Sequence, residues 1–191
     1  PVSDNGVTTR VLTTDWLVSP VKDKANVYIS ADQKEIILWN GLLRRAFVVA
    51  PDVACVDFRN LSNNQQLLRA VKPEARITID GHPYNIGGLS GQPENAYLRP
   101  EWVSRMSKLN DDFVFSNYTV NDLKPYIQWK ANTWTGNKSQ PTGKTLTFHF
   151  VGKRLPVQGI QLDVQYEIYD GLPLIVKSVH VRNAGQSSVK I

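Results

Sequence analysis

Apolar and polar residues alternate most regularly over positions 160–169, where every second side chain up to position 168 is apolar. A period of two is typical of a β-strand that turns one face to a core and the other to water. The pair Asp170-Gly171 comes next and readily takes the positive φ angles of a tight turn. A second alternating stretch follows at 174–183, although Lys177 interrupts its apolar face. We therefore predict a β-hairpin over residues 160–183.

Similar short strands, separated by turn residues, are predicted along most of the chain. They span residues 25–30, 35–39, 42–49, 53–59, 75–80, 82–86, 113–123, 126–129 and 144–151. Asn40-Gly41 and Asp80-Gly81 each stand between two of these strands, as in hairpins. So many short strands are typical of an all-β fold, a sandwich or a barrel. We predict one antiparallel two-sheet β-sandwich domain over residues 1–191, with a ragged lead-in at 1–20.

Residues 87–112 break this pattern, because they carry no strand signal and are too many for a hairpin loop. Pro100-Glu101 opens a predicted short helix within this long loop. Trp102, Met106 and Leu109 fall on one apolar stripe of that helix. We expect the helix to pack across a sheet edge or over an open end of the sandwich. The alternative is a helix that binds a partner.

Charge and cysteine content narrow the range of partners. The formal net charge is +5, from 22 Lys and Arg against 17 Asp and Glu, but the basic residues are spread out. Nucleic acid calls for a clustered basic face, so we expect no nucleic-acid partner. Cys55 is the one cysteine of the sequence and stands among apolar residues, which excludes an internal disulfide and predicts a buried thiol.

The sequence says less about the compartment. No apolar run approaches the length of a membrane-spanning helix, so we expect no membrane span. The chain starts at Pro1 without a Met, which favours removal of a leader or an upstream segment. This weakly favours an extracytoplasmic location, periplasmic or secreted, over the cytoplasm, and the compartment stays open.

Reactive side chains are scattered. His82, His149 and His180 lie far apart in the sequence, and one cysteine completes no metal-ligand spacing. The pair Asp111-Asp112 points to opposite sides of an extended chain. The glycine-rich stretch 87–91 lacks the Lys-Ser/Thr ending of a phosphate loop. We therefore predict no catalytic residue, no metal and no cofactor.

The strongest hint of sugar contact is an aromatic and amide-rich stretch. It contains Tyr126, Gln128, Trp129, Asn132 and Trp134. Sugars stack their C–H faces on aromatic rings while their hydroxyls bond to amides. We take Tyr126, Trp129, Asn132 and Trp134 as candidate contacts to carbohydrate or to a partner, although most strand tryptophans belong to a core. Trp102 joins them, because Trp102 and Trp134 could form apolar surface that another domain covers.

Five stretches, read in order, resemble the N-terminal domain of bacterial α-galactosidases of the melibiase type. They are IILWNGLLRRAF at 36–47, LLRAVKPEA at 67–75, DGHPYNIGGLSGQP at 80–93, AYLRPEW at 96–102 and YEIYDGLPLIVKSVHVRN at 166–183. The match covers most of residues 36–191. Its specificity lies in the order and spacing of the stretches, since no single one is chemically decisive.

The resemblance implies a β-supersandwich of the kind also found in galactose mutarotase. In the family this domain precedes a (β/α)₈ barrel that holds the catalytic aspartates. The domain packs against the barrel, supports assembly into homo-oligomers, and in some members lines the rim of the sugar site. Retaining glycoside hydrolysis needs two carboxylates about 5 Å apart, and in the family these lie in the barrel, which residues 1–191 do not include.

The leading prediction is therefore a non-catalytic domain at the N-terminal side of a longer glycoside hydrolase. Its expected partners are the barrel of the same chain, a galactoside and further copies of itself. A stand-alone carbohydrate-binding module is the first alternative. A mutarotase-like epimerase is a more distant one, because that chemistry needs a His and a Glu placed as acid and base around one sugar ring.

Overall fold

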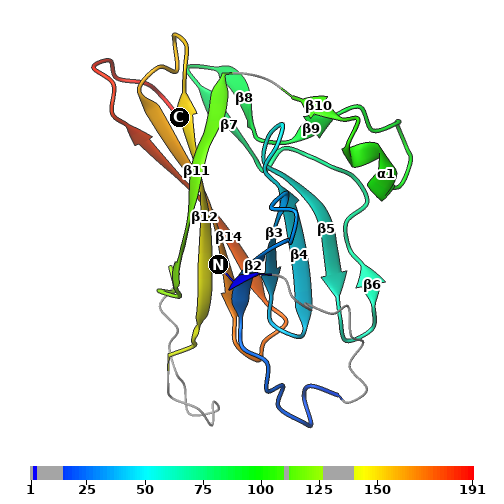
Figure 1. The fold of residues 1–191 in the computed structure, drawn as a ribbon. Coiled ribbons are helices and arrows are strands. Elements are labelled where there is room, and N and C mark those ends of the chain that lie inside the picture. The colour runs from blue at the N-terminus through cyan, green and yellow to red at the C-terminus, as the bar shows by residue number, and fades with distance from the viewer. Residues whose placement is uncertain (1, 4–14, 110–111, 127–139) are drawn as a thin grey trace.

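The computed structural model describes residues 2–3, 15–109, 112–126 and 140–191. Two β-sheets face each other across a hydrophobic interior and contain most of the strands (Figure 1). The protein is an all-β sandwich, as the alternation of apolar and polar residues predicts.

The N-terminal sheet contains six strands within the described residues, in the spatial order β1-β2-β3-β4-β5-β6. These strands are Val2–Ser3, Asn26–Ile29, Glu35–Trp39, Leu43–Val48, Ala54–Asn60 and Gln65–Gln66. β1 runs parallel to β2, whereas the other neighbours are antiparallel. From β2 to β6, strands that are adjacent in sequence are also adjacent in space and antiparallel, so connections as short as Asn40-Gly41 suffice to join them.

The C-terminal sheet has the order β11-β12-β13-β14, counted over the described residues, and is antiparallel. Its strands are Phe113–Asp122, Gly143–Gly152, Ile160–Tyr169 and Ile175–Asn183. β13 and β14 are the predicted hairpin, with Ile160 opposite Asn183 and Ile168 opposite Ile175. Gly171 has a φ of +66° in the turn between them, which confirms the predicted role of Asp170-Gly171.

Two smaller ribbons accompany the main sheets. β7 (Ala75–Ile79) and β8 (His82–Ile86) form the second predicted hairpin. β9 (Leu89–Ser90) pairs with β10 (Ser107–Lys108), two short strands that the sequence pattern did not predict within 87–112. The predicted strand at 126–129 is wrong at Tyr126, which lies outside any strand, and its other residues lie outside the described ranges.

The predicted helix is present but short. α1 spans Pro100–Val103, so Met106 lies beyond its end instead of on a longer helical stripe. Trp102 and Val103 still pack against a second apolar cluster, whose buried members are Val48, Ala54, Val71, Leu89 and Met106. Val48 and Ala54 are next to Phe47 and Cys55 of the main core and therefore lie on the opposite, outer face of the N-terminal sheet. α1 thus packs on this outer face near one end of the sheet (Figure 1).

Aromatic rings from both sheets meet in the main core. Phe47 of β4 lies 5.0 Å from Phe148 of β12 and 4.9 Å from Tyr166 of β13, measured between ring centroids. All three side chains are fully buried. Alternate residues of β12 and β13 fill the rest of this layer, including Leu146, Phe150, Leu162, Val164 and Ile168.

The Asn40-Gly41 turn ties the two sheets together. Asn40 is fully buried, and its Oδ1 accepts hydrogen bonds from the backbone N–H groups of Leu42 and Leu43. Its Nδ2 donates to the carbonyl oxygens of Tyr169 and Leu172, both at 2.7 Å. The turn of the β3–β4 hairpin is thereby fastened to the turn of the β13–β14 hairpin.

The prediction of one wet face on β13 is wrong at the end of the strand. Glu167 and Tyr169 lie on that face, yet each is only 1% exposed. The Tyr169 hydroxyl donates to Glu167 Oε2 at 2.6 Å, and the backbone N–H of Tyr126 donates to Oε1 at 3.0 Å. The chain at Tyr126 therefore folds across this end of the sheet, which strand periodicity cannot foresee.

Candidate functional site

Five polar side chains from separate parts of the chain form a cluster inside the sandwich. Its members are Arg45 of β4, Cys55 of β5, Glu74 just before β7, Tyr166 of β13 and Lys177 of β14, named below the Glu74 cluster. Glu74 and Tyr166 are buried and Lys177 is partly open to solvent. Polar groups buried among apolar side chains must find partners, so this cluster is the first place to look for chemistry.

Glu74 is the centre of this cluster. Its Oε1 accepts a hydrogen bond from the backbone N–H of Cys55 at 2.6 Å, and its Oε2 accepts one from the Tyr166 hydroxyl. Lys177 Nζ lies 3.4 Å from Oε2 and also donates to the Glu74 carbonyl oxygen, while Arg45 Nη2 lies 4.0 Å from Oε2. Both carboxylate oxygens are thus engaged by the protein itself.

A β-bulge in β5 gives Cys55 its place. Ala46 pairs with Asp57 but Phe47 pairs with Cys55, which leaves Val56 as the extra residue. The bulge reverses the alternation, so that Cys55 and Phe58 both contact the main core. At this position the backbone N–H of Cys55 donates to Glu74 Oε1.

The local charges follow from burial and from the Glu74 carboxylate. Burial raises the pKa of the Cys55 thiol to about 11. Burial and then the charge of Glu74 hold the pKa of Tyr166 well above its usual range. Burial lowers the pKa of Lys177, with Glu74 opposing that shift. Cys55 and Tyr166 therefore stay protonated at neutral pH, and Cys55 is no nucleophile, in agreement with the predicted buried thiol.

Arg45 completes the cluster through contacts with neighbouring aromatic rings as much as through its charge. Its guanidinium carbon lies 4.8 Å from the centroid of Tyr166, 4.9 Å from Phe58 and 5.3 Å from Phe47. Burial alone would lower the pKa of Arg45, but attraction by Cys55, Tyr166 and Glu74 raises it above its ordinary value. A permanently charged guanidinium held between aromatic faces is a rigid packing element.

The cluster can therefore join the two sheets, but it is badly placed to act on a substrate. A general base must reach the proton of a bound substrate with a free lone pair. The Glu74 carboxylate instead receives the Cys55 N–H, the Tyr166 hydroxyl and Lys177. Its arrangement is that of a structural ion pair with supporting hydrogen bonds.

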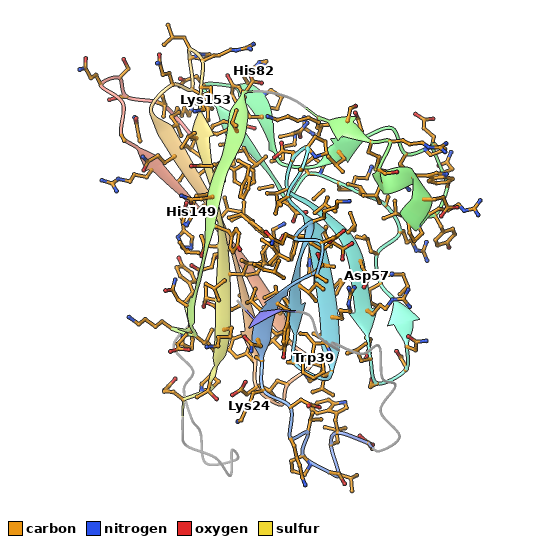
Figure 2. The ribbon with its side chains drawn as sticks, viewed as in Figure 1. Lys24, Trp39, Asp57, His82, His149 and Lys153 are labelled. Carbon is orange, nitrogen blue, oxygen red and sulfur yellow. The ribbon has the colours of Figure 1, made fainter. Side chains whose placement is uncertain are left out.

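A second polar group lies on the outer face of the N-terminal sheet. Asp57 accepts hydrogen bonds from Arg44 Nη1, from Arg59 Nε at 3.1 Å and from Gln66 Nε2 at 2.6 Å. These residues line a cavity of about 590 Å³, named here the Asp57 cavity, whose wall includes Leu98, Pro100 and Val103. Figure 2 places Asp57 on the side of β5 that faces away from the C-terminal sheet.

The outer face of the C-terminal sheet carries a chain of hydrogen bonds across three strands. His149 Nδ1 lies 2.6 Å from Asp163 Oδ1, and His149 Nε2 lies 3.0 Å from Thr119 Oγ1. His180 of β14 stands opposite Asp163 in the ladder. An acid, an imidazole and a hydroxyl follow the order of an acid-base relay, but Asp163 is 42% exposed on a sheet face, where water competes for each contact.

The three histidines do not converge on one site. His82 packs its ring against Tyr84 at the hairpin of β7 and β8, far from His149 in Figure 2. Within the described residues, no group of three or more His, Cys, Asp or Glu side chains could hold a metal ion. In the same part of the chain, no helix is long and apolar enough to cross a membrane.

Tyr126 and Trp102 are the predicted sugar or partner contacts that fall within the described residues, and Tyr126 is the more accessible of the two. Its side chain is 65% exposed and its ring meets the edge of His180, with 5.5 Å between centroids. Trp102 is half-buried against the second apolar cluster, with Arg99 over its ring at 5.9 Å. Trp129, Asn132 and Trp134 lie outside the described residues.

Sequence reasoning missed both the Glu74 cluster and the Asp57 cavity. Lys177 on an otherwise apolar strand face was the visible signal for the first, but its partner stands 103 positions away. For the second, Arg44 and Asp57 each lie on predicted strands, without any sign that the chain near Leu98 would cover them.

A comparison of the sequence with protein-family models and with curated proteins finds no match.

Proposed function

We propose that this chain is a non-catalytic β-sandwich domain of a carbohydrate-active enzyme that resembles an α-galactosidase. In this role it supports a catalytic barrel of the same protein and contributes surface beside the sugar site. The proposal rests on the family resemblance of five stretches together with the positions that their residues take in the fold.

The observation that carries the proposal is the origin of the residues in the Glu74 cluster. Arg45 belongs to the first resembling stretch, Glu74 to the second, and Tyr166 and Lys177 to the last. These separate stretches meet in one closed cluster between the sheets. The residues of these resembling stretches therefore hold the sandwich together, which is what a supporting domain requires.

The Asp57 cavity is the surface that we assign to the rim of the sugar site. Charged and amide side chains line its floor, and apolar residues of the segment around α1 form one wall. Carboxylates, guanidinium groups and amides are the usual partners of sugar hydroxyls. Asp57 and Arg44 are each 16% exposed, so they are held in place and still reach the cavity.

An activity assay tests the absence of catalysis. The folded chain is incubated with an aryl α-galactoside, beside an authentic α-galactosidase as a positive control. We expect no release of the phenol above that in buffer, because the barrel carboxylates are not part of residues 1–191. Turnover that follows this protein through purification and is lost on Asp57→Ala would contradict the proposal.

The encoding gene gives a second, independent test. The proposal requires that the reading frame continue from residue 191 into a (β/α)₈ barrel. A stop codon directly after this position would reject the role as a supporting domain and leave the binding module as the better account.

One observation favours a stand-alone carbohydrate-binding module as the second candidate. Tyr126 exposes an aromatic ring beside His180 on the outer face of the C-terminal sheet, and Ser178 bonds to His180 there at 3.0 Å. Titration with methyl α-galactoside tests it, with Tyr126→Ala and Trp134→Ala as variants. Leu155→Ala is the matched control, because Leu155 is exposed but lies on the connection between β12 and β13.

Binding that both aromatic variants abolish and Leu155→Ala preserves would favour the binding module. Binding that none of the variants alters would place the sugar elsewhere on the domain. Faster optical equilibration of galactose in the presence of the chain would instead support the mutarotase alternative.

A further inference from the structure

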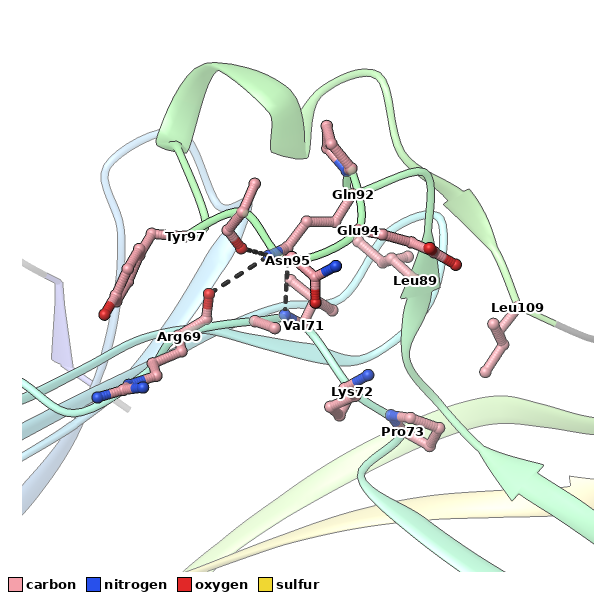
Figure 3. A pocket seen from close by; sticks show the side chains of 13 residues that line it. Arg69, Val71, Lys72, Pro73, Leu89, Gln92, Glu94, Asn95, Tyr97 and Leu109 are labelled. Carbon is pink, nitrogen blue, oxygen red and sulfur yellow. Dashed lines mark hydrogen bonds between the residues drawn. The ribbon is translucent and has the colours of Figure 1, made fainter.

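A cavity of about 710 Å³ opens beside the second apolar cluster, between residues 69–73 and residues 92–97 (Figure 3). Leu89 and Leu109 line it as well. Cavities that hold small ligands span roughly 300–1,000 Å³. This cavity, named here the Tyr97 cavity, is separate from the Asp57 cavity and from the exposed face around Tyr126.

The two walls of the Tyr97 cavity are fastened to each other. Gln92 Oε1 accepts a hydrogen bond from the backbone N–H of Val71 at 3.0 Å. Gln92 Nε2 donates to the carbonyl oxygens of Ala96 at 2.7 Å and Arg69 at 3.3 Å, and the Leu98 N–H donates to Arg69 O at 2.8 Å. The dashed lines in Figure 3 mark the side-chain bonds. The cavity is thus largely preformed, which lowers the entropy lost on binding.

The polar groups around this cavity are free to bond to a ligand. Within the described residues, the side chains of Lys72, Glu94 and Asn95 and the hydroxyl of Tyr97 have no hydrogen-bond or ion-pair partner in the protein. The charged groups of the Asp57 cavity, in contrast, bond to one another. Hydrogen-bond donors and acceptors therefore both face the Tyr97 cavity, where only water can bond to them.

Tyr97 supplies an aromatic surface at the same place. Its side chain is 66% exposed, and the Arg69 guanidinium carbon lies 5.4 Å from its ring centroid. The contact with Arg69 steadies the ring, since a cation is attracted to the face of an aromatic side chain. An exposed, steadied ring is a stacking platform for the C–H face of a ligand.

The charges decide which ligand fits. Arg69 and Lys72 repel a cation, and Glu94 repels an anion. A ligand with a net charge of either sign therefore meets repulsion from one of the two walls. A neutral ligand with several hydroxyls uses donors and acceptors alike and offers a C–H face to Tyr97. We propose that the Tyr97 cavity is a binding site for a neutral mono- or disaccharide.

This site stands on its own chemistry, and only the choice of galactosides as probes rests on the proposed function. The probes are methyl α-galactoside, methyl α-glucoside and melibiose, with inorganic phosphate as the anionic comparison. Amide chemical shifts of the ¹⁵N-labelled chain are followed up to about 50 mM of each probe, which detects millimolar dissociation constants.

We expect a saccharide to shift the amides of residues 69–73 and 92–97 in a saturable way. Tyr97→Ala should weaken this binding roughly tenfold, which corresponds to about 1.4 kcal/mol. Leu155→Ala is the control, because it removes an exposed side chain from the connection between β12 and β13 and should leave the dissociation constant unchanged. Unchanged dispersion in the spectrum of Tyr97→Ala verifies its fold.

Three results would overturn the inference: no shift of these amides with any saccharide, equal binding by Tyr97→Ala, or a response to phosphate in place of sugar. None of these results affects the expectation that the chain does not hydrolyse an aryl α-galactoside. The saccharide site and the supporting role can therefore be rejected independently of each other. Shifts confined to residues near Tyr126 would favour the binding module instead.

Discussion

The Tyr166 hydroxyl donates a hydrogen bond to the Glu74 carboxylate, although the two residues stand 92 positions apart. Tyr166 belongs to the C-terminal sheet, whereas Glu74 lies in the segment between the N-terminal sheet and β7. The same carboxylate is approached by Lys177 and Arg45. One buried anion thus connects parts of the fold that no short-range pattern links.

Glu74→Gln should lower the free energy of unfolding by about 3 kcal/mol. The amide keeps the size of the side chain but leaves Lys177 and Arg45 without a negative partner, and breaking a buried ion pair costs about 3–5 kcal/mol. Urea unfolding followed by tryptophan fluorescence measures the change. Glu94→Gln is the control, since Glu94 is exposed, and should change stability by less than about 0.5 kcal/mol. Equal effects of the two variants would contradict the structural role of Glu74.

Asn40→Ala should lower the free energy of unfolding by about 3 kcal/mol. It removes four hydrogen bonds at a fully buried position and leaves the carbonyl groups of Tyr169 and Leu172 unsatisfied. Each such bond contributes about 1 kcal/mol. Thermal and urea unfolding measure the loss, with the exposed Gln161→Ala as control. A loss below about 1 kcal/mol would mean that the two turns hold together without Asn40.

The stability of the protein should fall between pH 9 and pH 11 in a way that depends on Cys55. Its pKa is raised from 9.0 to about 11 by burial, so the unfolded chain loses the thiol proton first. The stabilising contribution is complete below pH 9 and is lost as the pH rises towards the folded pKa. At pH 10.5 this loss amounts to about 2 kcal/mol.

Cys55→Ala isolates that contribution, because it removes the thiol and leaves every other titratable side chain in place. Urea unfolding at pH 8 and pH 10.5 should give a smaller pH-dependent loss for the variant. The same burial predicts that a thiol reagent labels native Cys55 at pH 8 far more slowly than the unfolded chain, since the side chain is 4% exposed. Parallel pH curves, or rapid labelling of the native protein, would refute the buried, protonated thiol.

Asp170→Asn should destabilise the protein by about 1–2 kcal/mol at neutral pH. Burial raises the pKa of Asp170, but hydrogen bonds from Thr142, the Ala25 N–H and Lys24 outweigh burial and hold the pKa below its usual value. The contribution is therefore present above the ordinary pKa of 3.8 and disappears as the pH falls below it. Acid unfolding of both proteins checks this. The variant should show less loss of stability below pH 4, and an unchanged profile would assign that loss to other carboxylates.

Strand positions were predictable wherever one residue in two faces the core. The predicted strands 35–39 and 82–86 coincide with β3 and β8, and the hairpin of β13 and β14 lies within the predicted 160–183. The turns were equally readable, because Asn40-Gly41, Asp80-Gly81 and Asp170-Gly171 each place a glycine with positive φ between two strands.

What escaped prediction depends on contacts between distant segments. β9 and β10 consist of two residues each, too few to show alternation. The bulge at Val56 reverses the inward side of β5 in the middle of an apolar run. The sequence pattern predicts a solvent-exposed Glu167, but the chain at Tyr126 covers it in the fold. Likewise, nothing near Tyr97 in the sequence marks the wall formed by residues 69–73.

The buried Asn40 also imposes an order on how the molecule is made. Its side-chain amide can donate to its two carbonyl partners only after they have been synthesised, 129 and 132 positions later in the chain. While the chain emerges from the ribosome, the first hairpins can pair, but their turn has no anchor and their apolar inner face no cover until the last hairpin is released. Contacts between residues so far apart in the sequence slow folding and prolong the lifetime of aggregation-prone intermediates. Chaperone occupancy on the nascent polypeptide should therefore persist until β14 has left the exit tunnel.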